Sequence, residues 1–140
     1  MIDVVSIGEV VIDFSPSGKG RMGNPLFEMN PGGAPANCLA ANTKLGGSTA
    51  FIGMVGDDLF GNFLIGVLKD SGIETRGVVK TDKACTTLAF VSIDENGDRD
   101  FAFVRNPGAD HTITVDDIDF SLIDECKILH CGSITLSAEP

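Results

Sequence analysis

The pattern of apolar and polar positions predicts alternating strands and helices over the first half of the chain. Residues 4–8 and 10–14 are short apolar runs typical of buried strands, the second continuing the first past a bend at Gly8. Helical spacing follows over residues 35–45, and a further strand is predicted at 48–56. The clearest helix covers residues 59–68, where apolar side chains form one continuous face. This alternation is typical of an α/β fold with a parallel sheet.

Both predicted helices have boundary residues of the expected kind. Pro35 suits the first helical position, because the N–H that proline lacks has no partner there. The glycine pair at 46–47 can end this helix. Asp57 or Asp58 is a suitable N-terminal cap for the second helix, and Gly72 ends it.

The alternation of strands and helices stops after residue 77. Strands are predicted at 78–80, 86–93 and 100–104, with no helix between them. Residues 94–98 contain an Asn-Gly pair, which is a strong signal for a hairpin turn. We therefore expect an antiparallel ribbon inserted into the α/β domain.

Two further regions complete the predicted organisation. Residues 15–29 are rich in Gly, Ser and Pro and indicate a loop, with at most a short strand at 26–28. A short helix capped by Thr114 is expected at 115–123, and a buried strand at 127–131. Because no helix follows this last strand, we expect the chain to be a fragment of a longer protein.

Composition narrows the classes of function. The 140 residues are about one domain long, and 43% hydrophobic residues with a mean hydropathy of +0.19 provide enough apolar material for a core. The net charge of −10 argues against nucleic acid or an anionic membrane as the main partner. No apolar run approaches the roughly 20 residues of a transmembrane helix. No signal peptide is recognised.

The four cysteines predict a reducing compartment. None of them has C-x-x-C spacing, and the two histidines are not arranged with them as in a zinc site. We therefore expect buried free thiols in a cytoplasmic protein, and no metal site in this stretch.

The adjacent glycines Gly32 and Gly33 are the first candidate for binding chemistry. They immediately precede a helix start, where exposed N–H groups can bind an anion or the hydroxyls of a small polar molecule. A tight loop between a strand and a helix is the alternative interpretation. The stretch has neither the G-x-G-x-x-G pattern of dinucleotide-binding loops nor the Gly-Lys-Ser/Thr of a Walker A loop.

A carboxylate and an aromatic strand are the second candidate. Asp13 lies near a predicted strand end, where it either caps a loop or points at a ligand. Alternation places Phe101, Phe103 and Arg105 on one face of their strand. Such a face is either a core-facing aromatic pair beside a solvated charge, or an aromatic wall with a charged hydrogen-bond donor over a polar ligand.

Together these motifs resemble the N-terminal part of the ribokinase-like sugar kinases, the PfkB family. The segments that carry the resemblance are residues 8–13, 32–37, 41–47 and 51–61. Residues 98–110 are most similar to bacterial fructokinases, and 2-keto-3-deoxygluconate kinases share much of that segment. The resemblance covers essentially the whole chain.

The resemblance implies a three-layer α/β/α domain with an inserted antiparallel β-lid. The lid strands would lie at about residues 10–30 and 77–106, and the C-terminal ATP-binding part would be absent. It also implies a homodimer formed through the lid. The residues that it implies for sugar binding are Asp13, Gly32, Gly33, Asn37, Phe103 and Arg105.

The family's catalytic Gly-Ala-Gly-Asp motif is absent from these 140 residues. That motif stabilises the transferred phosphoryl group and removes the proton of the sugar hydroxyl. The Gly56-Asp57-Asp58 stretch matches a different signature and is not assigned to catalysis. We therefore expect no catalytic residue and no kinase activity in this stretch alone.

For the whole protein the resemblance implies a fructokinase that uses ATP and Mg²⁺, with a monovalent cation as a further candidate. A 2-keto-3-deoxygluconate kinase or a nucleoside kinase of the same family is the alternative enzyme. A stand-alone module for sugar binding or dimerisation is the alternative outside enzymes.

Overall fold

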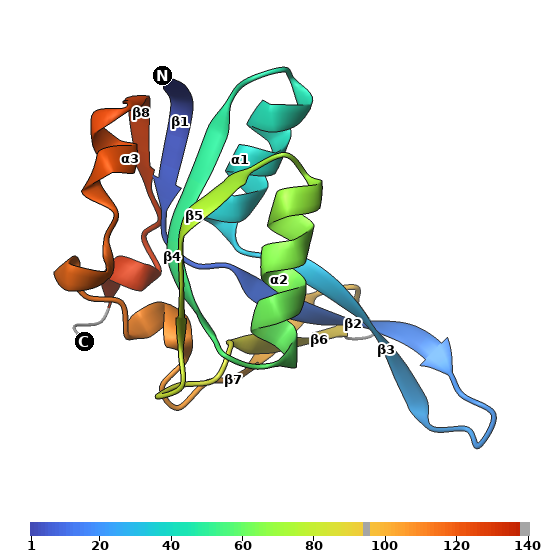
Figure 1. Ribbon diagram of the computed structural model, residues 1–140. Helices are drawn as coiled ribbons and strands as arrows, with labels where there is room; N and C mark the ends of the chain where they lie inside the picture. Colours follow the sequence, from blue (N-terminus) through green and yellow to red (C-terminus); the bar gives the residue numbers. More distant parts are fainter. Residues whose placement is uncertain (94–95, 138–140) are drawn as a thin grey trace.

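Two β-sheets organise the chain in the computed structural model, which describes residues 1–93 and 96–137 (Figure 1). The first sheet has the strand order β5-β4-β1-β8, and every neighbouring pair in it is parallel. Its strands are β1 (Ile2–Ile7), β4 (Thr49–Gly56), β5 (Glu74–Thr81) and β8 (Cys126–Cys131). The predicted parallel α/β sheet is therefore confirmed.

Helices cover both faces of this first sheet (Figure 1). Helices α1 (Ala34–Lys44) and α2 (Leu59–Asp70) lie on one face, and the short α3 (Phe120–Asp124) lies on the other. Neighbouring side chains of β1 point to opposite faces. Val4 accordingly belongs to the larger apolar core on the side of α1 and α2, whereas Val5 packs with Leu122 of α3. The result is a three-layer arrangement.

The predicted boundaries of the two long helices are confirmed. Pro35 lies in the first turn of α1, which ends at Lys44 ahead of the glycine pair. Asp58 caps α2, and its Oδ1 accepts a hydrogen bond from the N–H of Gly61 at 2.7 Å. Each of these helix starts therefore has a signal in the local sequence.

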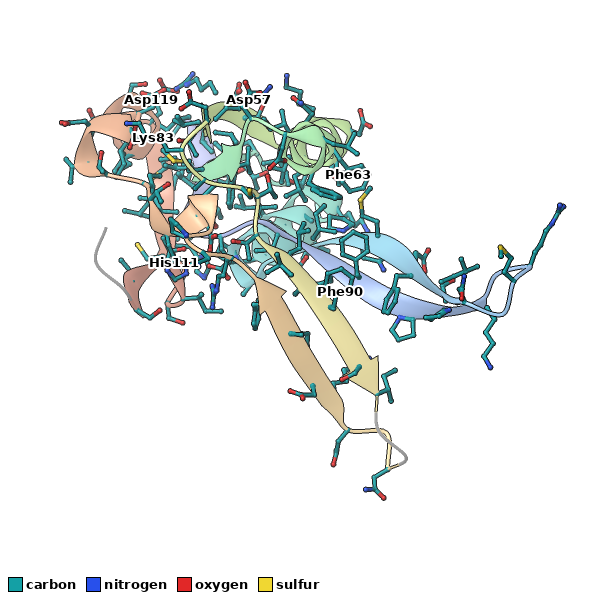
Figure 2. The ribbon with its side chains drawn as sticks, turned by 90° about the horizontal axis from the view of Figure 1, so that it is seen from below. Asp57, Phe63, Lys83, Phe90, His111 and Asp119 are labelled. Atoms are coloured by element: carbon teal, nitrogen blue, oxygen red, sulfur yellow. The ribbon has the colours of Figure 1, made fainter. Side chains whose placement is uncertain are left out.

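The second sheet has the strand order β3-β2-β6-β7. Strand β2 (Val11–Lys19) pairs with β3 (Pro25–Gly32) in an antiparallel hairpin, and β6 (Leu88–Ile93) with β7 (Arg99–Val104) in another. Strands β2 and β6 join the two hairpins in parallel. Figure 2 shows both hairpins extending away from the α/β body. Phe90 stacks on Phe14 where β6 lies beside β2, with ring centroids 4.8 Å apart.

The loop predicted for residues 15–29 is wrong, because most of these residues form the β2–β3 hairpin. The outer half of this hairpin is exposed on both faces, so its sequence lacks the apolar alternation that marks a half-buried strand. The first two apolar runs also do not form one continuous strand. The chain leaves the first sheet after Ile7 and enters the second sheet at Val11.

The predicted antiparallel ribbon is confirmed for β6 and β7 but not for the strand before them. Strand β5 pairs in parallel with β4 and belongs to the first sheet. The predicted turn at 94–98 falls partly on residues 94–95, which lie outside the described residues. Gly97, which is described, has a φ of +86°, as an Asn-Gly turn requires.

The helix predicted for residues 115–123 is divided into two short pieces. A 3₁₀ turn covers Val115–Asp117, and Asp117 accepts hydrogen bonds from both the N–H and the hydroxyl of Thr114. Asp119 then caps α3 by accepting from the N–H of Ser121. The second cap begins a new helix, because its extended backbone interrupts the first.

Two predictions of burial are wrong. Strand β8 is an edge strand, and its Ile128 and Leu129 are 59% and 41% exposed. The cysteines are free thiols, as expected, but Cys38, Cys85 and Cys131 are exposed.

No helix in the described part of the chain is long and apolar enough to cross a membrane.

Candidate functional site

The order of strands in the first sheet indicates where a ligand would bind. From β1 the chain moves to β4 and β5 on one side, whereas β8 lies on the other side of β1. Open α/β sheets bind ligands beyond the carboxyl ends of their strands, at the point where the order reverses. A cavity of about 190 Å³ lies at this point. Its walls come from the segments after β1 and β8, the start of α1, and the second sheet.

The register of the second sheet brings Asp13 and Phe103 onto the same face. Asp13 of β2 is paired with Ala89 of β6, and Ala89 is paired with Phe103 of β7. Directly paired residues point to the same side of a sheet. Both side chains line the cavity, and Phe101 and Arg105, two positions away on either side of Phe103, line it with them.

The aromatic face forms one wall of this cavity. The rings of Phe101 and Phe103 are stacked, with centroids 6.1 Å apart, and the Arg105 guanidinium lies 4.7 Å from the centroid of Phe103. Phe101 is 44% exposed and Phe103 is 49% exposed. The interpretation of a core-facing aromatic pair is therefore wrong. These rings offer a flat apolar surface beside a charged hydrogen-bond donor.

Neither of the two glycines at the start of α1 leaves room for a side chain. Gly33 has a φ of +106°, and a Cβ on it would lie 2.5 Å from the backbone oxygen of Glu9. A Cβ on Gly32 would lie 2.8 Å from Cγ of Asp13 and would collide with its Oδ2. Gly33 therefore lets the chain enter the helix, and Gly32 leaves the space that the Asp13 carboxylate occupies.

Glu9 occupies the N-terminus of α1, which the sequence suggested as a site for an anion or hydroxyls. Its side chain is 4% exposed, and Oε1 accepts a hydrogen bond from the N–H of Ala34 at 3.3 Å. Because Gly33 has no side chain, Glu9 supplies the capping group from a distant segment. Sequence reasoning did not select this residue. The sequence signal for Glu9 is an acidic residue within an apolar segment. The helix that follows this segment has a glycine at its N-cap position and therefore needs a capping group from elsewhere.

Asp110 is a second carboxylate that sequence reasoning missed. It lies in the 3₁₀ turn Ala109–His111 and is 2% exposed. Oδ1 accepts a hydrogen bond from the Thr87 hydroxyl. Oδ2 lies 3.5 Å from Nε2 of His111 and 4.0 Å from Nη1 of Arg105. Arg105 Nη1 and His111 Nε2 are themselves 2.9 Å apart.

Burial raises the pKa of the Asp13 carboxyl above its ordinary value of 3.8. Loss of solvation disfavours the charged form of a carboxyl group. A ligand hydroxyl that donates to this carboxylate would replace the lost water. The side chain can therefore accept hydrogen bonds from the hydroxyls of a ligand in the cavity.

The structure brings four of the six predicted site residues to the cavity wall, namely Asp13, Gly33, Phe103 and Arg105. Gly32 lies behind the Asp13 carboxylate. Asn37 does not line this cavity but lines a neighbouring one of about 200 Å³ between α1 and α2, as Gly32 does.

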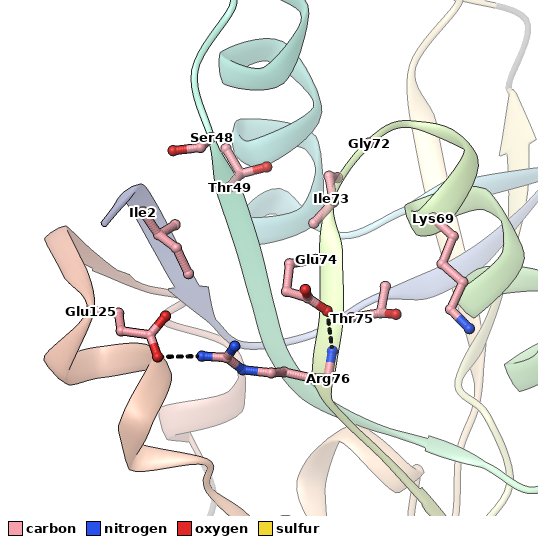
Figure 3. A pocket seen from close by; sticks show the side chains of 10 residues that line it. All are labelled: Ile2, Ser48, Thr49, Lys69, Gly72, Ile73, Glu74, Thr75, Arg76 and Glu125. Carbon is pink, nitrogen blue, oxygen red and sulfur yellow. Dashed lines mark hydrogen bonds and ion pairs between the residues drawn. The ribbon is translucent and has the colours of Figure 1, made fainter.

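A larger and more open hollow of about 530 Å³ lies at the opposite end of the first sheet (Figure 3). Its prominent side chain is Arg76, which lies 2.8 Å from Glu125 and 3.3 Å from Asp119. These ion pairs are solvent-exposed, and pairs of this kind contribute little to stability. The hollow is at the amino ends of the strands, so the cavity beside Asp13 is the better candidate.

Comparison with known proteins finds both similar sequences and similar folds. Residues 1–139 match the pfkB family carbohydrate kinases. The chain is 47% identical over 139 residues to fructokinase-1 of Zea mays, covering 98% of this chain and 43% of that protein. It therefore spans less than half the length of this relative.

Solved structures show the same fold. The crystal structure of fructokinase from Xylella fastidiosa superposes with a TM-score of 0.90 and 35% identity, over 99% of this chain and 43% of that one. A sugar kinase from Pyrococcus horikoshii in complex with ATP has a TM-score of 0.88 and 36% identity, over 98% of this chain and 45% of that one.

Proposed function

Because the chain belongs to the pfkB family of carbohydrate kinases, we propose that it forms the sugar-binding part of an ATP-dependent fructokinase. The whole protein would transfer the γ-phosphate of ATP to a hydroxyl of the sugar. The observation that carries this proposal is the convergence of Asp13, Gly33, Phe103 and Arg105 on one cavity at the carboxyl ends of the strands. A carboxylate, an apolar face and a hydrogen-bond donor are the groups that a small polyhydroxy compound requires.

Each group has a distinct part in sugar binding. Asp13 accepts hydrogen bonds from sugar hydroxyls, and Arg105 donates to a sugar oxygen. Phe103 packs against the C–H face of the sugar, and Gly33 lets the backbone approach it closely. Gly32 acts through Asp13, whose carboxylate it accommodates. A hydrogen bond from Asn37 to the sugar is proposed from the family resemblance alone.

We assign the nucleotide site and the catalytic aspartate to residues outside this stretch. Within residues 1–93 and 96–137, no group of three His, Cys, Asp or Glu side chains is placed to hold a metal ion. The carboxylate of Asp58 is bonded to Gly61 and Thr86, which leaves it occupied in capping α2. Because the Gly-Ala-Gly-Asp motif that the resemblance implies for catalysis is not among these 140 residues, we expect no phosphoryl transfer from this stretch alone.

The second sheet is proposed to act as a lid over the sugar and as a homodimer contact. It carries exposed apolar side chains on both hairpins, including Leu26, Phe27 and Phe101. Exposed apolar surface of this kind is often an interaction site. A cytoplasmic location is proposed from the four free thiols, which are typical of reducing compartments. A monovalent-cation requirement stays a prediction from the resemblance.

The test uses the full-length product of the gene that encodes this chain. ATP-dependent phosphorylation is measured with fructose, with 2-keto-3-deoxygluconate and with adenosine as substrates. We expect kcat/KM to be highest for fructose. Preference for either of the other two compounds would move the assignment to that kinase, and turnover of no sugar at all would favour a non-catalytic binding module.

A further inference from the structure

The cavity is lined by more carboxylates than cationic groups, although it contains an arginine. Three carboxylates, those of Glu9, Asp13 and Asp110, line the cavity together with one guanidinium, that of Arg105. The positive end of the α1 dipole is already matched by Glu9. The side chains that line the cavity therefore carry a net negative formal charge, although Arg105 alone would suggest a site for an anion.

Asp110 is the group that balances Arg105. Its side chain is nearly inaccessible, and among the described residues its Oδ2 has no hydrogen-bond partner. A buried carboxylate is costly unless opposite charge lies nearby. The guanidinium of Arg105, 4.0 Å from Oδ2, and the imidazole of His111, 3.5 Å from it, are the groups that face this oxygen.

We propose that Asp110 sets the charge selectivity of this site: by neutralising Arg105 it makes the cavity accept an uncharged sugar and reject a sugar acid. This inference rests on the proposed function and deepens it. An incoming carboxylate would have to compete with Asp110 for the guanidinium and would also be repelled by Glu9 and Asp13. A sugar hydroxyl meets neither obstacle, because it can donate to Asp13 and accept from Arg105.

Asp110 also holds Arg105 in place, because its buried carboxylate faces the guanidinium. The Thr87 hydroxyl fixes Oδ1, so the other oxygen is directed toward the arginine. The guanidinium is then confined between Asp110 and His111 on one side and the Phe103 ring on the other. Asp110 is therefore a positioning residue, and its effect should be seen in discrimination between substrates.

The test compares Asp110→Asn with the wild type in the full-length gene product. Asparagine keeps the shape and can still accept from Thr87, but it removes the charge. We expect the ratio of kcat/KM for fructose to that for 2-keto-3-deoxygluconate to fall at least tenfold, mainly through a lower KM for the acid. Asp116→Asn, at an exposed acidic position, is the control for a general change in net charge and should leave the ratio unchanged. A ratio within twofold of wild type for Asp110→Asn would overturn the proposal.

Binding measurements separate this inference from the proposed function. If the wild type phosphorylates neither compound, the kinase assignment fails, and thermal shifts with the same two compounds decide the selectivity. Stabilisation of Asp110→Asn, but not of the wild type, by the sugar acid would support the role of Asp110, and equal shifts would refute it. If Asp110→Asn does not fold, Asp110→Ser is tested in its place. Failure of both neutral variants to fold would mean that the charge serves folding rather than selectivity, against the proposal.

Discussion

Replacing Gly32 by alanine tests whether the Asp13 carboxylate is held in a defined position for ligand binding. Gly32 is not in the left-handed region, so the backbone can accept a side chain there. The new Cβ would lie 2.8 Å from Cγ of Asp13, which is closer than atoms of this kind approach. The Asp13 side chain must therefore rotate away from its present position, while the fold is retained.

The expected loss follows from the hydrogen bonds that Asp13 would make to the sugar. A hydrogen bond to a charged group contributes about 1.5–3 kcal/mol. Since about 1.4 kcal/mol corresponds to a factor of ten, Gly32→Ala should raise KM for fructose roughly 10- to 150-fold. The melting temperature should change little, because the collision is relieved by one side chain.

Two other glycines provide matched comparisons. Gly33→Ala places a side chain at a φ of +106° and against the backbone oxygen of Glu9, which cannot rotate away. A residue held in such a sparsely populated backbone region costs about 1–3 kcal/mol before the collision is added, so stability should fall clearly. Gly66 lies inside α2, and a Cβ added there would point into open space, so Gly66→Ala should stabilise the protein by up to about 1 kcal/mol.

A double-mutant cycle gives the decisive measurement for Gly32. In an Asp13→Ala background the carboxylate is absent, so Gly32→Ala should have no further effect on KM. The reasoning is refuted if Gly32→Ala keeps the KM of the wild type, or if its effect is fully additive with that of Asp13→Ala. Melting temperatures of all four proteins show whether any loss comes from unfolding.

Three further perturbations test the roles of single side chains. Arg105→Ala should raise KM for the sugar about tenfold or more, since it removes a charged donor worth ~1.5–3 kcal/mol; an unchanged KM would exclude Arg105 from the site. Asp13→Asn should weaken sugar binding but raise the melting temperature at neutral pH. Burial raises the pKa of Asp13 in the folded state, so ionisation of this carboxyl lowers the free energy of unfolding as pH rises through that pKa. The gain in melting temperature from Asp13→Asn should therefore shrink in acid, where the carboxyl is neutral in the wild type as well. A gain in melting temperature that does not depend on pH would contradict this account. Asp58→Ala should lower the free energy of unfolding by about 1–2 kcal/mol, measured by urea denaturation, because it removes the cap of α2 together with the bonds to Thr86; no loss would show that the cap is redundant.

Local sequence signals were sufficient to predict α1, α2 and the shared face of the β7 side chains. Pro35 lies in the first turn of α1 and Asp58 caps α2 within one turn, so both helix starts have a signal in the local sequence. The same holds for Phe101, Phe103 and Arg105, whose shared face follows from the alternation of a strand. Their position in a cavity wall needed the register between three strands, which only the structure gives.

Features that depend on distant partners could not be predicted in this way. The outer part of the β2–β3 hairpin is exposed on both faces, so its strands carry no apolar pattern. The membership of β5 in the first sheet depends on its pairing with β4. Glu9 caps a helix that begins 25 positions later, and no short sequence window contains both groups.

The net charge of the groups that line the cavity also depends on contacts between separate segments of the chain. Arg105, taken with the aromatic residues beside it, indicates a site that can bind either a hydroxyl or a carboxylate. The alternatives are separated by Asp110, which follows it by only five residues but contacts it through a turn and is fixed by Thr87 from another segment. The sequence motif thus identifies Arg105 as a hydrogen-bond donor. Which substrate the site binds depends on how completely the charge of this guanidinium is balanced by Asp110. Variation at position 110 should therefore alter substrate charge preference even where the residues that touch the sugar are unchanged.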